Sequence, residues 1–414
     1  MQKPLDTARL AGLAHRHGTP LWVYDAAIIR QRIAALKAFD VIRFAQKACS
    51  NLHILRLMRE EGVVVDSVSY GEIERALRAG YSAKGEPAGI VFTADVITED
   101  TISKVVEHGI PVNAGSIDML EQLGSQAPGH PVWLRINPGF GHGHHNKVNT
   151  GGELSKHGIW HTDLPYAIAV IERTGLKLKG LHMHIGSGVD YHHLEQVCGT
   201  MVALVKSAKH DLEAISTGGG LTVNYRDTDP LVDTAHYFAL WDAARREIQA
   251  FLDHPVRLEI EPGRYLMAES GLLLAEVRAA KQMGRNHFVL VDAGFTELVR
   301  PAMYGSYHAI SVIPGNGDPL ARRVVRDTVV AGPLCESGDV FTLDEGGVVA
   351  PRPLPAAQPG DLLAFHDVGA YGSSMSSNYN SRPLAAEVLL DDTEDRLIRR
   401  RQTIEELIAL EETH

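Results

Sequence analysis

Cysteine is scarce in this chain, with only Cys49, Cys198 and Cys335 among 414 residues. An odd, widely spaced set does not make a disulfide framework, so a reducing compartment and a cytoplasmic location are expected. Long apolar runs are also missing, because no segment approaches the roughly 18 apolar residues of a membrane span. The first 13 residues lack the basic segment and apolar stretch of a secretory signal. No membrane association is therefore expected.

Basic residues are outnumbered, with 40 Lys and Arg against 51 Asp and Glu and a formal net charge of −11. This balance argues against nucleic acid or an anionic membrane surface as a main partner. Hydrophobic residues make up 44% of the chain, which is enough for a sizeable core. The length allows one large domain and a smaller one.

Short apolar runs alternate with segments of helical periodicity between about residues 40 and 261. Eight of these runs are predicted strands: Val41–Ala45, Val63–Val68, Ile90–Thr93, Pro111–Asn113, Val132–Ile136, Leu178–Ile185, Leu212–Ser216 and Val256–Ile260. Eight strand–helix units match a parallel (β/α)8 barrel. An open doubly wound sheet is the alternative, but it usually has fewer strands and often a glycine-rich first turn.

After residue 265 the pattern changes to β-like segments punctuated by Gly, Pro, Asn and Asp. These segments predict a second, mainly antiparallel β domain, to which Leu21–Tyr24 near the N-terminus could add a strand. The fold class is therefore α/β. The predicted boundaries are 25–262 for the barrel, with 1–24 and 263–414 forming the β domain that completes the active site and a dimer interface.

The turn Glu261-Pro262-Gly263-Arg264 directly follows the last predicted barrel strand. It holds a carboxylate and a guanidinium three residues apart. The carboxylate can pair with a cationic ring nitrogen, and the guanidinium can pair with a phosphate. Pyridoxal phosphate carries both groups, so this turn, together with Lys47 and the triplet Gly218–Gly220, predicts a pyridoxal-phosphate enzyme.

Lys47 and the glycine triplet each follow a predicted strand. Active sites of such barrels lie at the C-terminal ends of the strands, where a lysine can form an imine with an aldehyde cofactor. Three glycines let backbone N–H groups approach a phosphate closely. Taken alone, a surface lysine and an ordinary glycine loop are the alternatives.

Two histidines, His182 and His184, end another predicted strand and share one face of it. They could form a metal pair, but no convincing set of further ligands lies on neighbouring strand ends. We favour one imidazole stacked on a flat cofactor ring, with Ser187 bonding a phosphate oxygen. The histidine-rich loop Gly141–His145 is interpreted as a polar loop over the site rather than as a metal site.

Three further motifs gather polar groups beside glycine or proline in the β domain: Arg300–Tyr304, Cys335–Asp339, and Gly369–Gly372 followed by Ser376–Asn380. An isolated cysteine is often a buried structural thiol. The carboxylate and glycine beside Cys335 favour a partly exposed thiol with a chemical role.

In combination, these motifs resemble the barrel-type pyridoxal-phosphate-dependent amino acid decarboxylases, and within them the bacterial diaminopimelate decarboxylases. The similarity runs from about Gly18 to Leu410 and includes the stretch from Asp66 to Glu72. The resemblance implies a carboxy-lyase that converts meso-2,6-diaminopimelate to L-lysine and carbon dioxide, the last step of lysine biosynthesis. It also implies a homodimer with shared active sites.

The resemblance further implies roles for individual residues. Lys47 would hold the cofactor as an imine, His184 would stack on its ring and Glu261 would face its nitrogen. The other cofactor contacts would be Asp66, Ser187, Gly218, Gly219, Gly220, Gly263, Arg264 and Tyr371. The substrate contacts would be Arg264, Arg300, Tyr304, Glu336 and Tyr371. Cys335 of the partner subunit would be the proton donor.

The residue type at position 261 bears on the reaction. Loss of carbon dioxide leaves a carbanion, and the cofactor withdraws its charge most strongly when the ring nitrogen is protonated. Glu261 favours that cationic nitrogen and so decarboxylation, whereas a racemase of this fold is expected to present an arginine. Arg300 suits a distal carboxylate and Glu336 a distal ammonium, which together predict a zwitterionic substrate end.

Two alternatives remain open at this point. The chain could be another decarboxylase of this fold, acting on carboxynorspermidine, ornithine or arginine, or it could be a non-catalytic regulatory homologue. The chain also departs from many relatives at Thr93–Val96, Cys49 and Ser216-Thr217. None of these departures removes a group that the chemistry requires.

Overall fold

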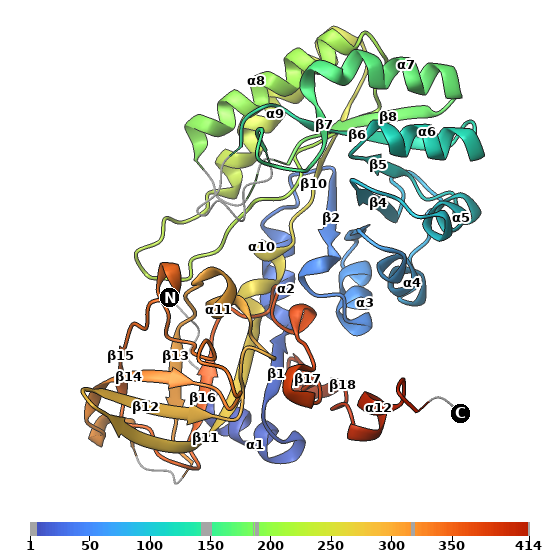
Figure 1. Cartoon of the computed structure of the whole chain (residues 1–414). Helices are drawn as coiled ribbons and strands as arrows, with labels where there is room; N and C mark the ends of the chain where they lie inside the picture. The colour runs from blue at the N-terminus through green and yellow to red at the C-terminus, as the bar shows by residue number, and fades with distance from the viewer. Residues whose placement is uncertain (1–5, 142–150, 185, 187–189, 316–318, 413–414) are drawn as a thin grey trace. The chain divides into compact units, whose positions relative to one another are not determined.

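The structure is a computed structural model that describes residues 6–141, 151–184, 186, 190–315 and 319–412 (Figure 1). The chain divides into two compact units. Residues 30–223 and 231–266 form the barrel unit, and residues 1–29, 224–230 and 267–414 form the β unit. Within the described ranges, no helix combines the length and the apolar character needed to cross a membrane.

Eight parallel strands close the barrel, because the last strand pairs with the first and the two middle strands also pair. In spatial order they are β2 (Val41–Ala45), β3 (Val64–Ser67), β4 (Ile90–Ala94), β5 (Val112–Ala114), β6 (Pro131–Asn137), β8 (Lys177–His182), β9 (Ala214–Ser216) and β10 (Arg257–Ile260). Each predicted run overlaps one of these strands, so the predicted barrel is confirmed. The short β7 (Ile159–Trp160) pairs with the end of β6.

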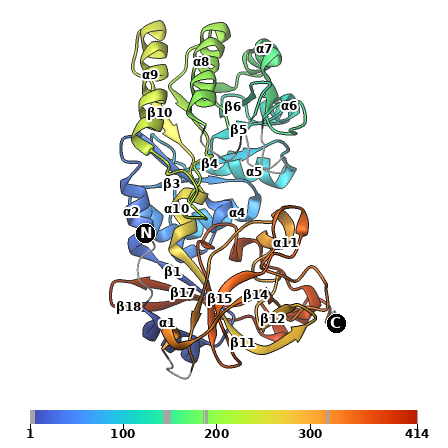
Figure 2. The same ribbon diagram turned by 90° about the vertical axis from the view of Figure 1, so that its left-hand side faces the viewer.

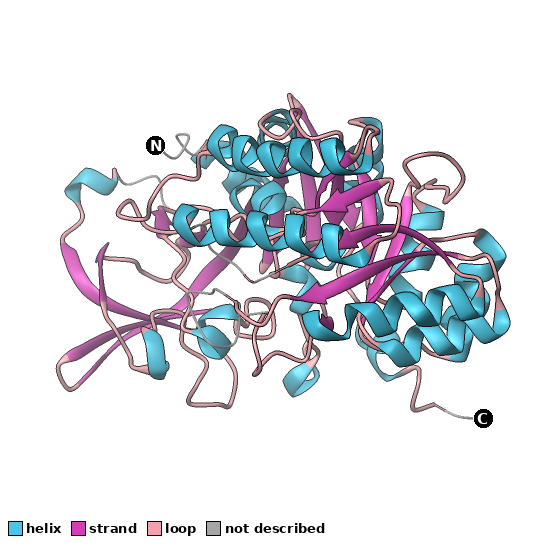
Figure 3. Cartoon of the chain, turned by 90° about the horizontal axis from the view of Figure 1, so that it is seen from above, coloured by secondary structure: helices cyan, strands magenta, loops and turns pink. Residues whose placement is uncertain are grey.

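Helices alternate with the barrel strands along the chain, and Figure 3 shows helices lying outside strands. They are α2 (Ala26–Ala34), α3 (Leu52–Glu60), α4 (Tyr70–Arg78), α5 (Glu99–His108), α6 (Ile117–Gln126), α7 (Leu164–Thr174), α8 (Tyr191–Ala208), α9 (Thr234–Leu252) and α10 (Arg264–Met267). Side chains cap several of their first turns, as where the Ser69 hydroxyl accepts from the Glu72 amide at the start of α4. Figure 2 shows α8 and α9 side by side, and the two helices pack together.

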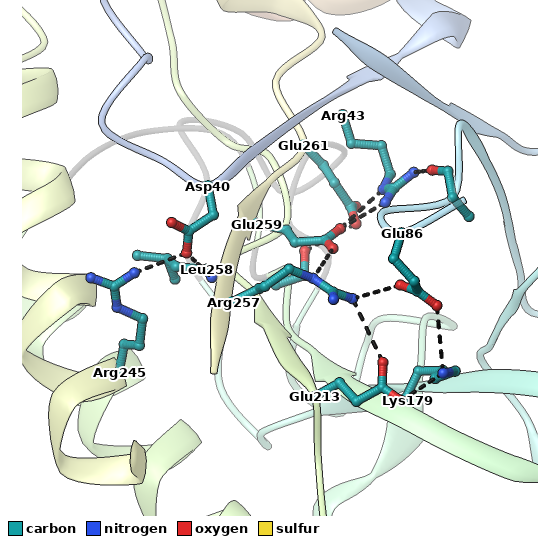
Figure 4. Close-up of polar contacts among 12 residues, drawn as sticks. Asp40, Arg43, Glu86, Lys179, Glu213, Arg245, Arg257, Leu258, Glu259 and Glu261 are labelled. Atoms are coloured by element: carbon teal, nitrogen blue, oxygen red, sulfur yellow. Dashed lines mark hydrogen bonds and ion pairs between the residues drawn. The ribbon is translucent and has the colours of Figure 1, made fainter. Parts of the chain in front are cut away.

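The barrel also buries a pair of opposite charges (Figure 4). Arg43 on β2 donates to the Glu259 carboxylate on β10 at 2.8 Å, and both side chains are 2% exposed. The guanidinium also donates to the carbonyl of Ala88 at 3.0 Å. Removing one partner of such a pair leaves an uncompensated charge in the interior, at a cost of about 3–5 kcal/mol. Each residue of the pair is therefore tolerated only because the other is present.

The β unit contains a nine-stranded sheet in which most neighbouring strands are antiparallel, as predicted. Its strands are β1 (Leu21–Asp25), β11 (Gly271–Met283), β12 (Asn286–Val291), β13 (Ile310–Ile313), β14 (Val325–Ala331), β15 (Arg352–Pro355), β16 (Leu362–Phe365), β17 (Ala386–Asp391) and β18 (Glu394–Arg399). The strand β1 pairs with β11 and β17, which confirms that the N-terminal strand joins this sheet.

The helices that accompany this sheet include α1 (Thr7–His17), α11 (Arg300–Tyr304) and α12 (Ile404–Ile408). Leu10 and Leu13 of α1 pack against Leu21 and Val23 of β1 in one buried cluster. The sequence did not indicate that residues 224–230, which lie between β9 and α9, would group with the β unit. These residues contact the β unit through a cation–π pair, since Arg226 lies 4.0 Å from the ring centre of Tyr307, and through an edge-to-face pair of Tyr225 with His308.

Candidate active site

Lys47 lies immediately beyond the C-terminal end of β2, as predicted. A short 3-10 turn, Gln46–Ala48, follows the strand, and Lys47 is exposed while its two neighbours are buried. The Gln46 amide anchors this turn by donating to the Ser67 hydroxyl at 2.6 Å and to the Glu72 carbonyl at 3.1 Å. These hydrogen bonds fix the turn, and Lys47 lies at the end of the barrel where active sites of this fold are found.

Two carboxyl groups on the next strand and helix lie within electrostatic range of Lys47. Asp66 is the penultimate residue of β3, is 4% exposed, and has a buried Oδ1 without a hydrogen-bond partner among the described residues. Burial, reinforced by the Glu261 charge, raises the pKa of Asp66 to about 8. Burial also raises the pKa of Glu72, whose carboxylate accepts from the Val68 amide at 2.8 Å.

Glu261 follows β10, and both of its carboxylate oxygens are bound. Oε2 lies 2.7 Å from Nε2 of His182, and Oε1 accepts from the Ser216 hydroxyl at 3.0 Å. Burial opposes ionisation, but His182, followed by Arg43 and Ser216, lowers the pKa of Glu261 to about 2. At neutral pH, Glu261 is therefore ionised while the nearby Asp66 is largely protonated.

His184 lies against the glycine triplet. The Gly219 amide donates to its Nδ1 at 3.1 Å, and burial, followed by the charges of Arg135 and Lys47, lowers its pKa well below the usual range. The imidazole is therefore neutral at pH 7. Gly218 has a φ of 63°, and a Cβ there would lie 2.5 Å from the Met183 carbonyl oxygen, so only glycine fits this close approach.

Sequence reasoning missed two residues of this site. Arg135 on β6 is 8% exposed, and its charge acts on Asp66, Glu261 and Asp95. His182 was considered with His184 as a metal pair or as a ring-stacking imidazole, and its contact with the Glu261 carboxylate was not predicted. A charged residue inside an apolar strand, as in the run 132–136, was the available signal for Arg135.

The other predicted cofactor residues of the barrel unit follow its last strands. Gly263 is buried in the turn after β10, and Arg264 is half-buried where α10 begins. Ser187 lies outside the described residues, as does the loop Gly141–His145 beyond Gly141. Across the part of the chain that the structure describes, no group of three or more His, Cys, Asp or Glu side chains could hold a metal ion.

In the β unit, the motif that contains Cys335 contacts the motif Ser376–Asn380. The Cys335 amide donates to the Asn380 side-chain oxygen at 3.1 Å, and the Ser377 amide donates to the Thr296 carbonyl at 3.0 Å. Buried Asp339 accepts from the amides of Leu334 and Phe295 at 2.8 and 2.7 Å. These contacts fix the turn on which Cys335 and Glu336 are exposed, so the prediction of an exposed thiol is confirmed.

Arg300 begins α11 and is 5% exposed. Its guanidinium donates to His308 Nε2 at 3.3 Å and to the Ser306 hydroxyl at 3.1 Å, and lies 5.4 Å from the ring centre of Tyr225. These contacts fix the orientation of the guanidinium. Tyr304, at the end of α11, is half-buried, as is Tyr371, which has a φ of 56°.

Comparison with known proteins identifies the family. Residues 25–268 match the family model described as "Pyridoxal-dependent decarboxylase, pyridoxal binding domain". A diaminopimelate decarboxylase from Streptomyces coelicolor is 66% identical over 407 residues, which cover 98% of this chain and 92% of the relative. The chain belongs to the diaminopimelate decarboxylase family.

Solved structures of this family have the same fold. A crystal structure of diaminopimelate decarboxylase superposes with a TM-score of 0.96 at 65% identity, covering 99% of this chain and 97% of the other. The Helicobacter pylori diaminopimelate decarboxylase, solved in complex with L-lysine, has a TM-score of 0.85 at 33% identity. It covers 97% of this chain and 99% of its own.

The residues at this end of the barrel suit the pyridoxal group that the family model names. The ionised Glu261 complements a protonated ring nitrogen, and the neutral His184 imidazole can lie against a flat ring. Asp66 Oδ1 is buried without a hydrogen-bond partner among the described residues, so it can bind a polar group of a ligand. The exposed Lys47 carries a primary amine, the type of group that reacts with an aldehyde.

The raised pKa of Asp66 predicts how the stability of the cofactor-free protein depends on pH. A carboxyl that binds its proton more tightly in the folded state contributes less stability as pH rises from the unfolded value near 4 toward about 8. Asp66→Asn should remove part of this loss of stability. Thermal unfolding should therefore show that the melting temperature of the variant rises relative to that of the wild type between pH 5 and pH 8. Asp118→Asn, an exposed substitution on α6, is the control. Parallel pH profiles for wild type and Asp66→Asn would contradict the assignment.

Proposed function

We propose that this protein is a pyridoxal-phosphate-dependent carboxy-lyase that converts meso-2,6-diaminopimelate to L-lysine and carbon dioxide. The observation that carries the proposal is a buried Glu261 held ionised at the barrel end that presents Lys47. Similarity over the whole length to enzymes named diaminopimelate decarboxylase supports the choice of substrate.

In this proposal the cofactor is held mainly by the barrel unit. Lys47 binds it covalently, His184 lies on its ring, and Glu261 accepts a hydrogen bond from the ring N–H. The remaining contacts are Asp66, Ser187, Gly218, Gly219, Gly220, Gly263, Arg264 and Tyr371. When bound, pyridoxal phosphate supplies an electron sink for the charge left on carbon as carbon dioxide departs. Glu261 contributes by keeping a proton on the ring nitrogen.

The substrate is recognised at its unreactive end. Arg300 binds the distal carboxylate through its planar fork, and Glu336 binds the distal ammonium. Arg264, Tyr304 and Tyr371 complete the substrate contacts. An acid paired with an arginine favours a substrate with a zwitterionic end over ornithine, whose distal end carries only an ammonium.

The stereochemistry of the reaction follows from its product. The L centre of meso-diaminopimelate survives in L-lysine, so the carboxylate that leaves belongs to the D centre. Cys335 of the partner subunit then gives its thiol proton to that carbon, and the thiolate regains a proton from solvent. We propose a homodimer in the cytoplasm, where the three free thiols would stay reduced.

The covalent role of Lys47 has a direct spectroscopic test. Lys47→Ala should lose the absorption band of covalently bound pyridoxal phosphate and should release no lysine from meso-diaminopimelate. Lys84→Ala, which removes another exposed lysine, should keep both the band and the activity. A persistent band in Lys47→Ala would refute the lysine assignment. Failure of the wild type to form lysine would refute the proposed reaction.

The role of Arg300 predicts selective loss of one contact. Arg300→Met should raise the KM for meso-diaminopimelate by roughly 10–100-fold, since a hydrogen-bonded charge contributes about 1.5–3 kcal/mol. D-Lysine keeps the reacting D centre but lacks the distal carboxylate, so its inhibition constant should stay within about twofold if the lost contact is the carboxylate pair. Equal weakening of both ligands would indicate general damage and contradict the assignment. Arg278→Ala, on the exposed part of β11, is the control.

A shared site predicts complementation between two inactive variants. Lys47→Ala and Cys335→Ala, each nearly inactive alone, should regain about a quarter of wild-type activity after their subunits are mixed and exchanged. Half of the dimers are then mixed, and each mixed dimer has one intact site of two. If Cys335 served the site of its own chain, both sites of every dimer would remain defective and mixing would restore nothing.

A further inference from the structure

The pair formed by His182 and Glu261 is part of the site that the family motifs leave unexplained. The two side chains come from β8 and from the turn after β10, 79 residues apart in the sequence. Their nitrogen and oxygen lie 2.7 Å apart, and the side chains are only 2% and 10% exposed. The short distance and the burial together make this a strong contact.

The hydrogen bonding of His182 indicates where its proton lies. Its Nδ1 is buried and has no hydrogen-bond partner among the described residues, whereas Nε2 faces the Glu261 carboxylate. A proton on Nδ1 would leave a buried donor unpaired, which costs more than an unpaired acceptor lone pair beside a full hydrogen bond. Nε2 of His182 is therefore assigned the proton that is donated to the Glu261 carboxylate.

Ser216 holds the other side of the same carboxylate. Its hydroxyl donates to Oε1 at 3.0 Å and accepts from the Gly218 amide at 3.1 Å, while the Glu261 amide donates to the Gly218 carbonyl at 2.8 Å. The carboxylate is thereby fixed to the ends of β8 and β9 and to the start of the glycine triplet. A carboxylate offers about four lone-pair directions, so two fixed donors leave directions free for a third.

We propose that His182 is a positioning residue for Glu261, because its Nε2–H orients the buried carboxylate so that a free lone pair meets the N–H of the cofactor ring. This inference rests on the proposed function. It separates the roles of two histidines on one strand end: His184 contacts the ring itself, whereas His182 acts through Glu261.

The test compares two cofactors in two variants. His182→Leu removes the donor, and His182→Gln keeps an N–H at a similar reach. The cofactors are pyridoxal phosphate and its 1-deaza analogue, in which C–H replaces the ring nitrogen. The analogue cannot use the Glu261 carboxylate, so it measures every effect of the substitution except the one on that hydrogen bond. His130→Leu, a buried histidine bonded to the Ile110 carbonyl, is the matched control.

Titration of the cofactor-free proteins should show that His182→Leu raises the dissociation constant of pyridoxal phosphate about tenfold, which corresponds to one hydrogen bond to a charged group. The dissociation constant of the deaza analogue should change far less. The kcat for meso-diaminopimelate should fall with little change in KM. His182→Gln should restore most of both values, and His130→Leu should alter neither the selectivity nor the kcat.

Equal weakening of the two cofactors by His182→Leu, or no weakening of either, would overturn the positioning role while leaving the proposed function in place. Failure of the wild-type protein to bind pyridoxal phosphate would instead overturn the proposed function, and this inference with it.

Discussion

The ionised carboxylate of Glu261 is the group on which the site in the barrel unit depends. A carboxylate removed from water ordinarily takes up a proton, because charge is poorly solvated in the interior. Here His182 and Ser216 each bind one oxygen, and Arg43 adds positive charge from β2. Ser216 lies on β9, which pairs with β10, and His182 lies on β8, which pairs with β9, whereas Arg43 lies on β2, which pairs with β10 where the barrel closes. Closure of the sheet therefore completes the set of partners that keeps Glu261 ionised.

The same closure places a second carboxyl in the opposite state. Asp66 is buried within reach of the Glu261 charge, and one of its oxygens has no donor among the described residues, so its pKa rises while that of Glu261 falls. Two acids in one barrel end can thus divide their roles, one as a fixed anion and the other as a proton holder. Arg135 and Lys47 place positive charges near these two carboxyl groups.

The barrel could be predicted because its eight strands are short apolar runs at regular spacing, and each run became a strand. The charges inside the barrel were harder to interpret. Arg43, Arg135 and Glu259 interrupt apolar runs, and in a sequence such interruptions resemble solvent-facing positions. The structure turns them inward, where Arg43 and Glu259 neutralise one another. Periodicity indicates which residues share a face, but it does not indicate which buried charge meets which.

By itself, the sequence determined the alternation of strands and helices, the motifs that mark the family, and the residue types that pyridoxal chemistry needs. Only the tertiary structure decided which of the two histidines, His182 or His184, binds Glu261 and which of two acids is ionised. It also decided that residues 224–230 join the β unit, where they contact Tyr307 and Arg300. The physical reason is distance. Ionisation and pairing depend on burial and on neighbours within a few ångströms, and in a closed barrel those neighbours come from strands far apart in the chain.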